Sequence, residues 1–384
     1  MQTASTALHR LLVERIHAGG PITFAKYMET CLYHSEFGYY NGSIERRRAD
    51  YYTSVDMSPI FGRLIARQIY EMWMLLASPS RFTIAELGAG TGSLARQILD
   101  FSRDELPKFY EAIDYRAIEI SAKRLEVAAS ALADHILAGH ASVLKETTEV
   151  IPQGCILTNE FFDALPVHRL VMHEGKLEEI YVDAIGDEFV ERRMPISSPE
   201  LDEYFRGQEV RLREGQHAEA SVRACEWIER IGGNLDRGFV LTIDYGREAR
   251  ELYDEHHMNG TMLAYCNHRA SEEYYRAPGE QDLTAHVSFT ALDLWGRKSG
   301  LIRTGLASQT HFLLSLAHQS NFADISNDAG ETTQHASQIR SRLQFKSLIF
   351  PDGMGETFQV MVQHKGIAAP ELTGLKLLKA QNLF

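Results

Sequence analysis

The chain has 384 residues, 44% of them hydrophobic, and a formal net charge of −13. Such a length and composition fit a folded protein with a sizeable core, arranged as two or three domains or as one elaborated α/β domain. Its basic tract is Arg46-Arg47-Arg48, too short to make nucleic acid an expected partner, and no apolar run in the sequence reaches membrane-spanning length.

The cysteines are scattered and form no C-x-x-C pair, which favours a reducing compartment. We therefore expect a cytoplasmic protein, or one of the mitochondrial matrix if the source is a eukaryote. The first 18 residues carry no signal-peptide core and no clear transit peptide.

The first 80 residues are predicted to be mostly helical. Thr23 is placed to cap a helix over 24–32, and Ser58-Pro59 is a typical helix start, with serine as the N-cap and proline at the first position. A preceding helix ends at Gly19-Gly20-Pro21, and its apolar side is formed by Leu8, Leu11, Leu12 and Ile16.

From residue 82 onwards, strands and helices are predicted to alternate, which is the pattern of a mostly parallel sheet. Helices are expected over 93–106 and 122–133. A long insertion follows the fourth strand, with a meander of short strands over 168–194 and a helix over 216–231. The expected strands of the sheet are 82–87, 115–120, 141–145, 155–158, 238–243, 301–307 and 358–363.

A glycine-rich turn joins the first strand to the first helix of this alternation. It reads Glu86-Leu87-Gly88-Ala89-Gly90-Thr91-Gly92, and glycines at this place let backbone N–H groups approach a ligand beside a helix N-terminus. A dinucleotide-binding fingerprint would need a third glycine at Ser93. The E-x-G-x-G-x-G form instead resembles the first motif of class I S-adenosylmethionine (SAM) methyltransferases, and we weigh it against an ordinary glycine-rich turn.

Polar side chains follow the predicted strands at their carboxyl ends, where doubly wound sheets bind ligands. Glu119, after the second strand, could accept hydrogen bonds from both ribose hydroxyls of a nucleoside, or could be a solvated strand-end acid. Asn159 and Glu160 follow the fourth strand, and Asp163 lies three residues further on. Acids among aromatic residues are usually paired or functional, although Asp163 could equally cap a turn.

Two further groups are less specific. Thr53 and Ser54 precede the helix that begins at Pro59 and could hold the amino-acid end of a cofactor, or could belong to an ordinary capped loop. His256-His257 invites a metal assignment, but adjacent histidines point in different directions and no third ligand is evident, so we predict no metal site.

Several blocks of the sequence, taken together and in order, resemble the MidA-like family, whose mitochondrial members help to assemble respiratory complex I. The resemblance spans nearly the whole chain, and its most specific parts are the E-F-F-D-A-L-P-V-H and P-G-x-x-D-L-T-A blocks. The blocks are Gly20–Met28, Gly38–Tyr40, Asp50–Ser54, Glu86–Gly92, Asn159–His168, Asp244–Gly246, Ala277–Val287 and Met354–Phe358.

The resemblance implies a Rossmann-like class I methyltransferase sheet of seven mostly parallel strands. On that basis we expect an N-terminal helical region over 1–80, a SAM methyltransferase domain over 81–164 and 238–364, a substrate or partner region over 165–237, and a tail over 365–384. The residues expected to bind the cofactor are Glu86, Gly88, Ala89, Gly90, Gly92, Glu119, Thr53, Ser54 and Asn159.

The resemblance further implies SAM-dependent methylation of a protein arginine, on both terminal nitrogens, in a subunit of complex I. Glu160 and Asp163 are then the candidate catalytic carboxylates, which would orient the guanidinium and take the released proton. The alternatives are a SAM-binding assembly factor without catalysis and a small-molecule N- or O-methyltransferase.

Overall fold

The computed structural model describes residues 6–42, 59–146, 149–266, 269–320 and 357–376, together with 322, 343, 345–346 and 348–349. These residues form two compact units, each assembled from three stretches of the chain. The first unit contains 1–51, 162–229 and 245–296, and the second contains 52–161, 230–244 and 297–384. The predicted four-part division into domains stays a prediction. Within the described part, no helix combines the length and the apolar character needed to cross a bilayer.

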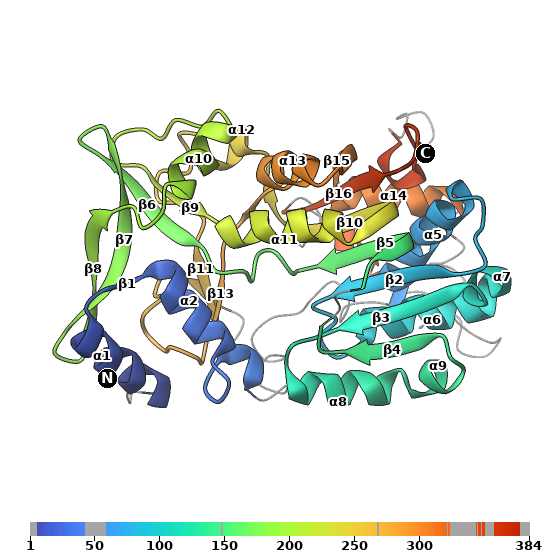
Figure 1. Cartoon of the computed structure of the whole chain (residues 1–384), viewed down its shortest axis with the longest axis horizontal. Coiled ribbons are helices and arrows are strands. Elements are labelled where there is room, and N and C mark those ends of the chain that lie inside the picture. The colour runs from blue at the N-terminus through green and yellow to red at the C-terminus, as the bar shows by residue number, and fades with distance from the viewer. Residues whose placement is uncertain are drawn as a thin grey trace. The chain divides into compact units, whose positions relative to one another are not determined.

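The second unit is built on a seven-stranded sheet (Figure 1). Five neighbouring strands are parallel, and the edge strand β15 runs antiparallel to β16. This confirms the predicted fold class and every expected sheet strand. In spatial order the strands are β15 (Ile302–Ser308), β16 (Phe358–Lys365), β10 (Leu235–Arg247), β5 (Ile151–Asn159), β2 (Phe82–Leu87), β3 (Ile113–Ile118) and β4 (Ala141–Leu144).

Helices pack on this sheet because its central strands are buried and mostly apolar: all six residues of β2 are buried, four of them apolar. Helix α5 (Pro59–Leu75) contacts both α6 (Ser93–Glu105) and α14 (Gln309–Gln319), and α6 contacts α8 (Ala122–Ala131). Helix α5 begins at Pro59 as predicted, and its apolar residues Ile60, Leu64, Ile65, Ile69 and Met72 are buried. The predicted helix over 122–133 is divided between α8 and α9 (Ala133–Leu137), and the short α7 (Pro107–Tyr110) precedes β3.

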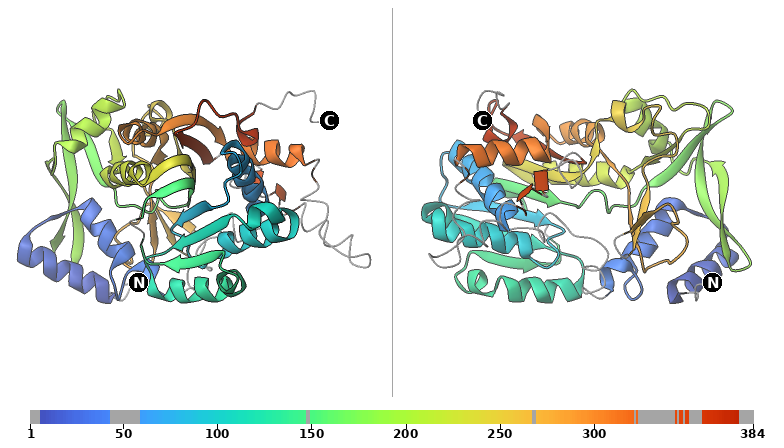
Figure 2. Two further views of the ribbon diagram at one scale, coloured as in Figure 1. Left: turned by 45° about the vertical axis from the view of Figure 1, so that its right-hand side comes forward. Right: turned by 180° about the vertical axis from the view of Figure 1, so that it is seen from behind.

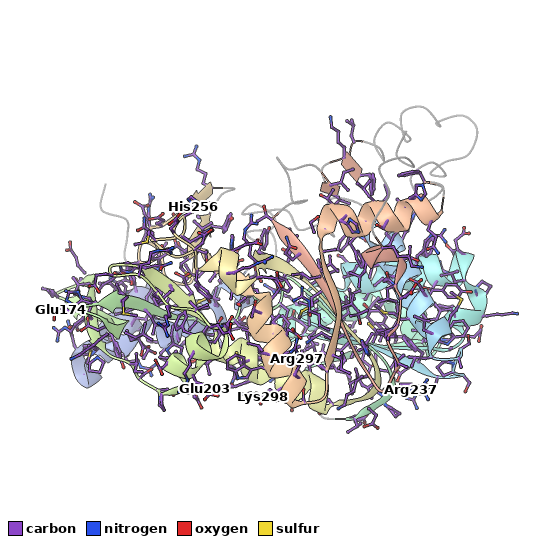
Figure 3. All side chains as sticks on the ribbon, turned by 90° about the horizontal axis from the view of Figure 1, so that it is seen from above. Glu174, Glu203, Arg237, His256, Arg297 and Lys298 are labelled. Carbon is purple, nitrogen blue, oxygen red and sulfur yellow. The ribbon has the colours of Figure 1, made fainter. Side chains whose placement is uncertain are left out.

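The first unit contains a five-stranded antiparallel sheet of β1 (Ile22–Thr23), β7 (Lys176–Ile185), β6 (His168–His173) and β9 (His217–Ala220), with β8 (Glu188–Pro195) paired to β7. The predicted meander is therefore present. Its turn at Glu174, which Figure 3 labels, is held by Glu214, whose carboxylate accepts the N–H groups of Glu174 and Gly175 at 2.7 and 3.1 Å.

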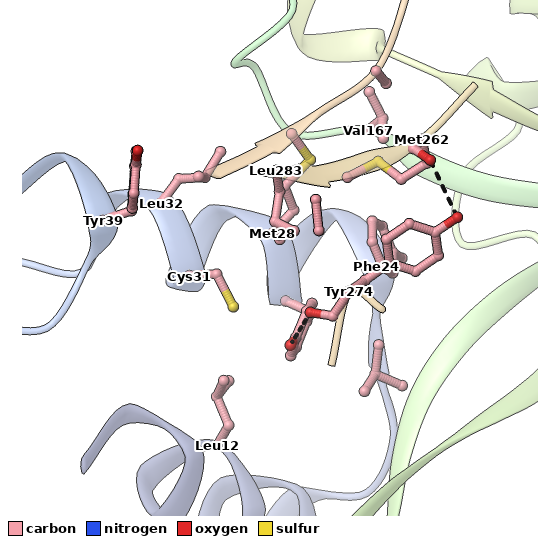
Figure 4. Packing of buried hydrophobic residues seen from close by; sticks show 14 of the residues in the cluster. Leu12, Phe24, Met28, Cys31, Leu32, Tyr39, Val167, Met262, Tyr274 and Leu283 are labelled. Atoms are coloured by element: carbon pink, nitrogen blue, oxygen red, sulfur yellow. Dashed lines mark hydrogen bonds between the residues drawn. The ribbon is translucent and has the colours of Figure 1, made fainter. Parts of the chain in front are cut away.

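Two N-terminal helices pack against this sheet, as the two views of Figure 2 show: α1 (Ala7–Gly19) and α2 (Phe24–Tyr33) both contact β7. Thr23 caps α2 as predicted, since its hydroxyl accepts the N–H of Lys26. A buried cluster unites these helices with a small sheet of β12 (Arg269–Ser271), β11 (Leu263–Cys266) and β13 (Asp282–Thr284) (Figure 4). Shorter helices complete the unit: η1 (Tyr39–Asn41), α10 (Glu200–Gly207) and α12 (Ala249–Leu252).

The helix predicted over 216–231 is partly wrong. Residues His217–Ala220 form β9, and α11 (Val222–Gly233) begins only afterwards. The reason is tertiary: β9 pairs with β6 in the register Leu170↔Ala218, and these sheet hydrogen bonds outweigh the helix propensity of the two alanines. Beyond the two units' main elements, β14 (Val287–Ser288) pairs with the end of β10, α13 (Phe289–Lys298) follows it, and η2 (Thr373–Leu375) contacts α14.

Candidate functional site

The candidate site lies where three neighbouring strands of the second unit end. The register pairs Leu87 of β2 with Ile118 of β3 and with Thr158 of β5. The next residues, Gly88, Glu119 and Asn159, therefore follow at the same edge of the sheet. Of the sequence-predicted residues in this unit, the structure thus brings the glycine turn, Glu119 and the Asn159-Glu160 pair to one edge.

The glycine turn has the backbone that its sequence requires. Gly88, Gly90 and Gly92 have φ angles of 70°, 57° and 75°, a region that side chains disfavour, and Gly92 is the N-cap of α6. A Cβ on Gly88 would lie 3.1 Å from the ring of Phe161, whereas a Cβ on Gly90 would approach no atom closer than a carbonyl oxygen at 4.0 Å. The turn is therefore closed on one side and open at Gly90.

Glu119 is held firmly although it lies beyond the end of its strand. Its carboxylate is 4% exposed, and its two oxygens accept the N–H of Gly90 at 3.0 Å and the N–H of Ser121 at 2.8 Å. The Arg124 guanidinium lies 3.8 Å from the oxygen that faces Gly90. A carboxylate has about four acceptor positions, so this one can accept further hydrogen bonds, as a ribose diol would require.

Glu86 lies in a different environment, one residue before the end of β2. It is 4% exposed, and one carboxyl oxygen accepts the Tyr115 hydroxyl at 2.7 Å. Burial, reinforced by the negative charge of Glu119, raises the pKa of Glu86 from 4.5 to about 8, against the lowering effect of the Tyr115 hydrogen bond. The side chain therefore carries a proton at neutral pH and acts inside the sheet as a neutral group.

The acids expected after the fourth strand fall into different units. Asn159 ends β5, its amide donates to a Glu160 oxygen at 3.2 Å, and the N–H of Glu160 donates to the Ile243 carbonyl at 3.0 Å. Glu160 itself is left-handed, with φ 51°. Asp163 belongs to the first unit, where its carboxylate accepts the Thr284 hydroxyl at 3.1 Å.

Other predicted residues are accounted for as follows. Thr53 and Ser54 lie outside the described residues. His256 is exposed (Figure 3), and the neighbouring His257 contacts Asp254 through its Nδ1 at 2.9 Å. In the described ranges, no three His, Cys, Asp or Glu side chains are grouped so that they could hold a metal ion.

Two residues of this edge escaped the sequence reasoning: Tyr115 and Arg124. Tyr115 and Arg124 reach the two acids from β3 and α8, and alternation in the sequence gives no sign of such cross-element pairs. Asp244 follows a predicted strand just as Glu119 does and lies in one of the blocks that carry the family resemblance, but the sequence reasoning gave it no role. It is fully buried and accepts the N–H of Phe161 at 3.2 Å.

Comparison with known proteins identifies the family of this chain. Residues 64–307 match the Methyltransf_28 model, described as "Putative S-adenosyl-L-methionine-dependent methyltransferase". The chain is 28% identical to a mitochondrial protein arginine methyltransferase NDUFAF7 homolog of Drosophila melanogaster, covering 95% of this chain and 86% of that one. It is 26% identical to the Homo sapiens NDUFAF7, covering 92% and 82%.

A solved structure matches this chain along almost its whole length. A COG1565 superfamily protein from Burkholderia thailandensis, crystallised with S-adenosyl-homocysteine, superposes with a TM-score of 0.84 at 28% identity and covers 96% of this chain and 94% of that one. The family model alone spans more than half of the sequence. The protein therefore belongs to the Methyltransf_28 family and is a class I SAM-dependent methyltransferase.

Proposed function

We propose that this enzyme is a protein-arginine N-methyltransferase that symmetrically dimethylates an arginine of a respiratory complex I-type subunit. The arginine methyltransferase part of the proposal is supported by relatives of that activity that match over more than nine-tenths of the chain. The observation that carries it is the carboxylate-bearing turn at Glu160, which follows β5 directly beside the strand that leads into the glycine turn. We infer that the enzyme works in the cytoplasm or, in a eukaryote, in the mitochondrial matrix.

The cofactor would be held by the edge of the second unit. The glycines of the turn Gly88-Ala89-Gly90 and Gly92 would let the backbone approach it closely, Glu119 would bind its ribose, and Asn159 would lie at its side. Glu86 would support the turn from within the sheet, and Thr53 and Ser54 are further proposed ligands. When bound, SAM supplies an electrophilic methyl carbon on a sulfonium.

The chain's own task is then to prepare a poor nucleophile. A guanidinium is cationic and keeps its protons at any physiological pH. A carboxylate that accepts two of its N–H groups fixes its plane and draws positive charge away from the remaining nitrogen. Glu160 is the first candidate for this role and for accepting the released proton, and Asp163 is the second.

The test compares Glu160→Gln with the unmodified enzyme. We expect Glu160→Gln to bind S-adenosyl-homocysteine normally in a calorimetric titration and to lose methylation by roughly 10²- to 10⁴-fold, the range for removal of an acid–base group. Asp163→Asn should lose less, since Asp163 also accepts the Thr284 hydroxyl. Full turnover by Glu160→Gln would remove that residue from the mechanism.

The substrate class is tested separately. SAM-dependent labelling of lysate proteins, followed by site mapping, should find an arginine whose peptide gains the mass of two methylene groups. Labelling of a small molecule instead would favour a small-molecule methyltransferase. A stable complex with a protein that gains no mass would favour an assembly factor without catalysis.

A further inference from the structure

The buried Asp244 lies just past the end of the backbone pairing between β10 and β5, where its side chain accepts a further N–H. The pairing of β10 with β5 ends at Ile243↔Asn159. One residue further, the N–H of Glu160 still reaches the Ile243 carbonyl at 3.0 Å. The next N–H, that of Phe161, has the Asp244 carboxylate as its acceptor at 3.2 Å. A side chain of β10 thus accepts the N–H that follows the end of the backbone ladder.

In this arrangement the N–H groups of both Glu160 and Phe161 are held by hydrogen bonds. Glu160 adopts a left-handed backbone conformation with φ 51°, which is unfavourable for any residue with a Cβ. Such a conformation persists only where the surroundings fix it, and functional sites are where it is found most often. The two hydrogen bonds from successive N–H groups supply that constraint.

The same turn also forms one wall of the glycine loop. A Cβ built on Gly88 would come within 3.1 Å of the Phe161 ring, so that ring packs against the backbone of Gly88. Asp244 holds the N–H of the residue that carries this ring. A single buried carboxylate therefore fixes both the turn that bears Glu160 and the aromatic wall of the turn at Gly88.

We propose that Asp244 is a positioning residue of this methyltransferase, which fixes Phe161 against the glycine turn and holds Glu160 in its left-handed conformation. The proposed effect on Phe161 predicts a change in cofactor affinity, and it assumes only that the protein belongs to this methyltransferase family. The part that concerns turnover rests on the role proposed above for Glu160.

The experiment measures S-adenosyl-homocysteine affinity by calorimetry and turnover on the mapped substrate for four variants. Asp244→Ala should bind about tenfold more weakly and lose turnover by a further factor of about ten or more. Asp244→Asn keeps an acceptor oxygen and should recover most of the affinity. Phe161→Ala removes the wall without touching Asp244 and should reproduce the loss of affinity.

The matched control is Asp114→Ala. Asp114 belongs to the same sheet and holds Arg81 and Arg116, but it lies near the start of β3 rather than at the ligand-binding edge. We expect this variant to lose stability while its affinity for S-adenosyl-homocysteine stays within twofold of the unmodified enzyme. An equal loss of affinity in Asp114→Ala would show a general effect of destabilisation and would overturn the inference.

The remaining outcomes are distinct. Wild-type affinity in a folded Asp244→Ala overturns the inference whatever Glu160 does. If Asp244→Ala does not fold, Phe161→Ala decides, and wild-type affinity there overturns it equally. Should Glu160→Gln keep full turnover while Asp244→Ala loses affinity, the role of Glu160 fails and the positioning of Phe161 by Asp244 stands.

Discussion

At the scale of single residues, two acids at the carboxyl ends of neighbouring strands have different environments. The Glu119 carboxyl group accepts two backbone N–H groups and lies near the Arg124 guanidinium. The buried Glu86 accepts the Tyr115 hydroxyl and is otherwise enclosed in the sheet. The sequence could predict that both acids matter, because Glu86 opens the glycine motif and Glu119 follows the next predicted strand. It could not predict the raised pKa of Glu86, since that depends on how deeply the fold buries its side chain.

The raised pKa of Glu86 makes a prediction about stability and pH. Between pH 4.5 and about 8 the unfolded chain is ionised at this residue while the folded protein keeps the proton, so stability falls as pH rises through this window. Glu86→Gln removes the titration and should be the more stable form at pH 8, by an amount on the order of a few kcal/mol. Urea unfolding of both forms at pH 5 and pH 8 measures it. A difference that does not grow with pH would contradict the assignment.

The open side of Gly90 leads to a second prediction at this scale. Gly90→Val places a branched side chain on the face where the glycine turn meets no other group, and should weaken S-adenosyl-homocysteine binding by at least about 100-fold. Gly139→Val is the matched control, because Gly139 also has a positive φ, at 83°, and a Cβ there meets nothing within 4 Å. Both variants carry backbone strain, and calorimetry should find normal binding only in Gly139→Val.

At the scale of elements, the sheet was predictable because its strands are short apolar runs separated by amphipathic helices. The strands β2 and β4 agree with prediction to within a residue, whereas β5 and β10 are longer than predicted because sheet pairing extends them past their apolar cores. The strand β9 was missed because its sequence, His-Ala-Glu-Ala, contains good helix formers. Glu219 can be buried there because Thr261 donates its N–H and its hydroxyl to the carboxylate, a pairing that no local pattern reveals.

The change from β9 to α11 depends on a cap. The Ser221 hydroxyl accepts the N–H of Ala224 at 3.2 Å, which satisfies a donor that the first turn of the helix leaves open. Ser221→Ala should therefore lower the free energy of unfolding by about 1 kcal/mol. Ser80→Ala, in an exposed loop, should change it by less than about 0.5 kcal/mol. Urea denaturation distinguishes the two, and equal effects would show that the cap contributes nothing.

At the scale of the whole molecule, each of the two compact units is assembled from three stretches of the chain. Residues close in sequence can therefore belong to different units. Glu160 and Asp163 show the consequence: they share one motif, yet one hydrogen-bonds within the second unit and the other within the first. Sequence motifs could identify the family and the glycine turn. They could not assign the two acids to different packing environments, because that depends on contacts with residues more than 80 and 120 positions away.

Cofactor binding should be visible as a pattern of protection across the second unit. A ligand that binds only the folded state stabilises it by about 2.7 kcal/mol at a concentration of 100 times Kd, so S-adenosyl-homocysteine should raise the thermal midpoint. Amide hydrogen exchange should slow at the ends of β2, β3 and β5, that is at 88–92, 119–121 and 159–161. Gly90→Val should show neither the thermal shift nor the protection, while Gly139→Val shows both. Protection unchanged at 88–92 in the unmodified enzyme would place the nucleoside elsewhere, because a ligand seated against that turn slows the local opening that exchange of its hydrogen-bonded N–H groups requires.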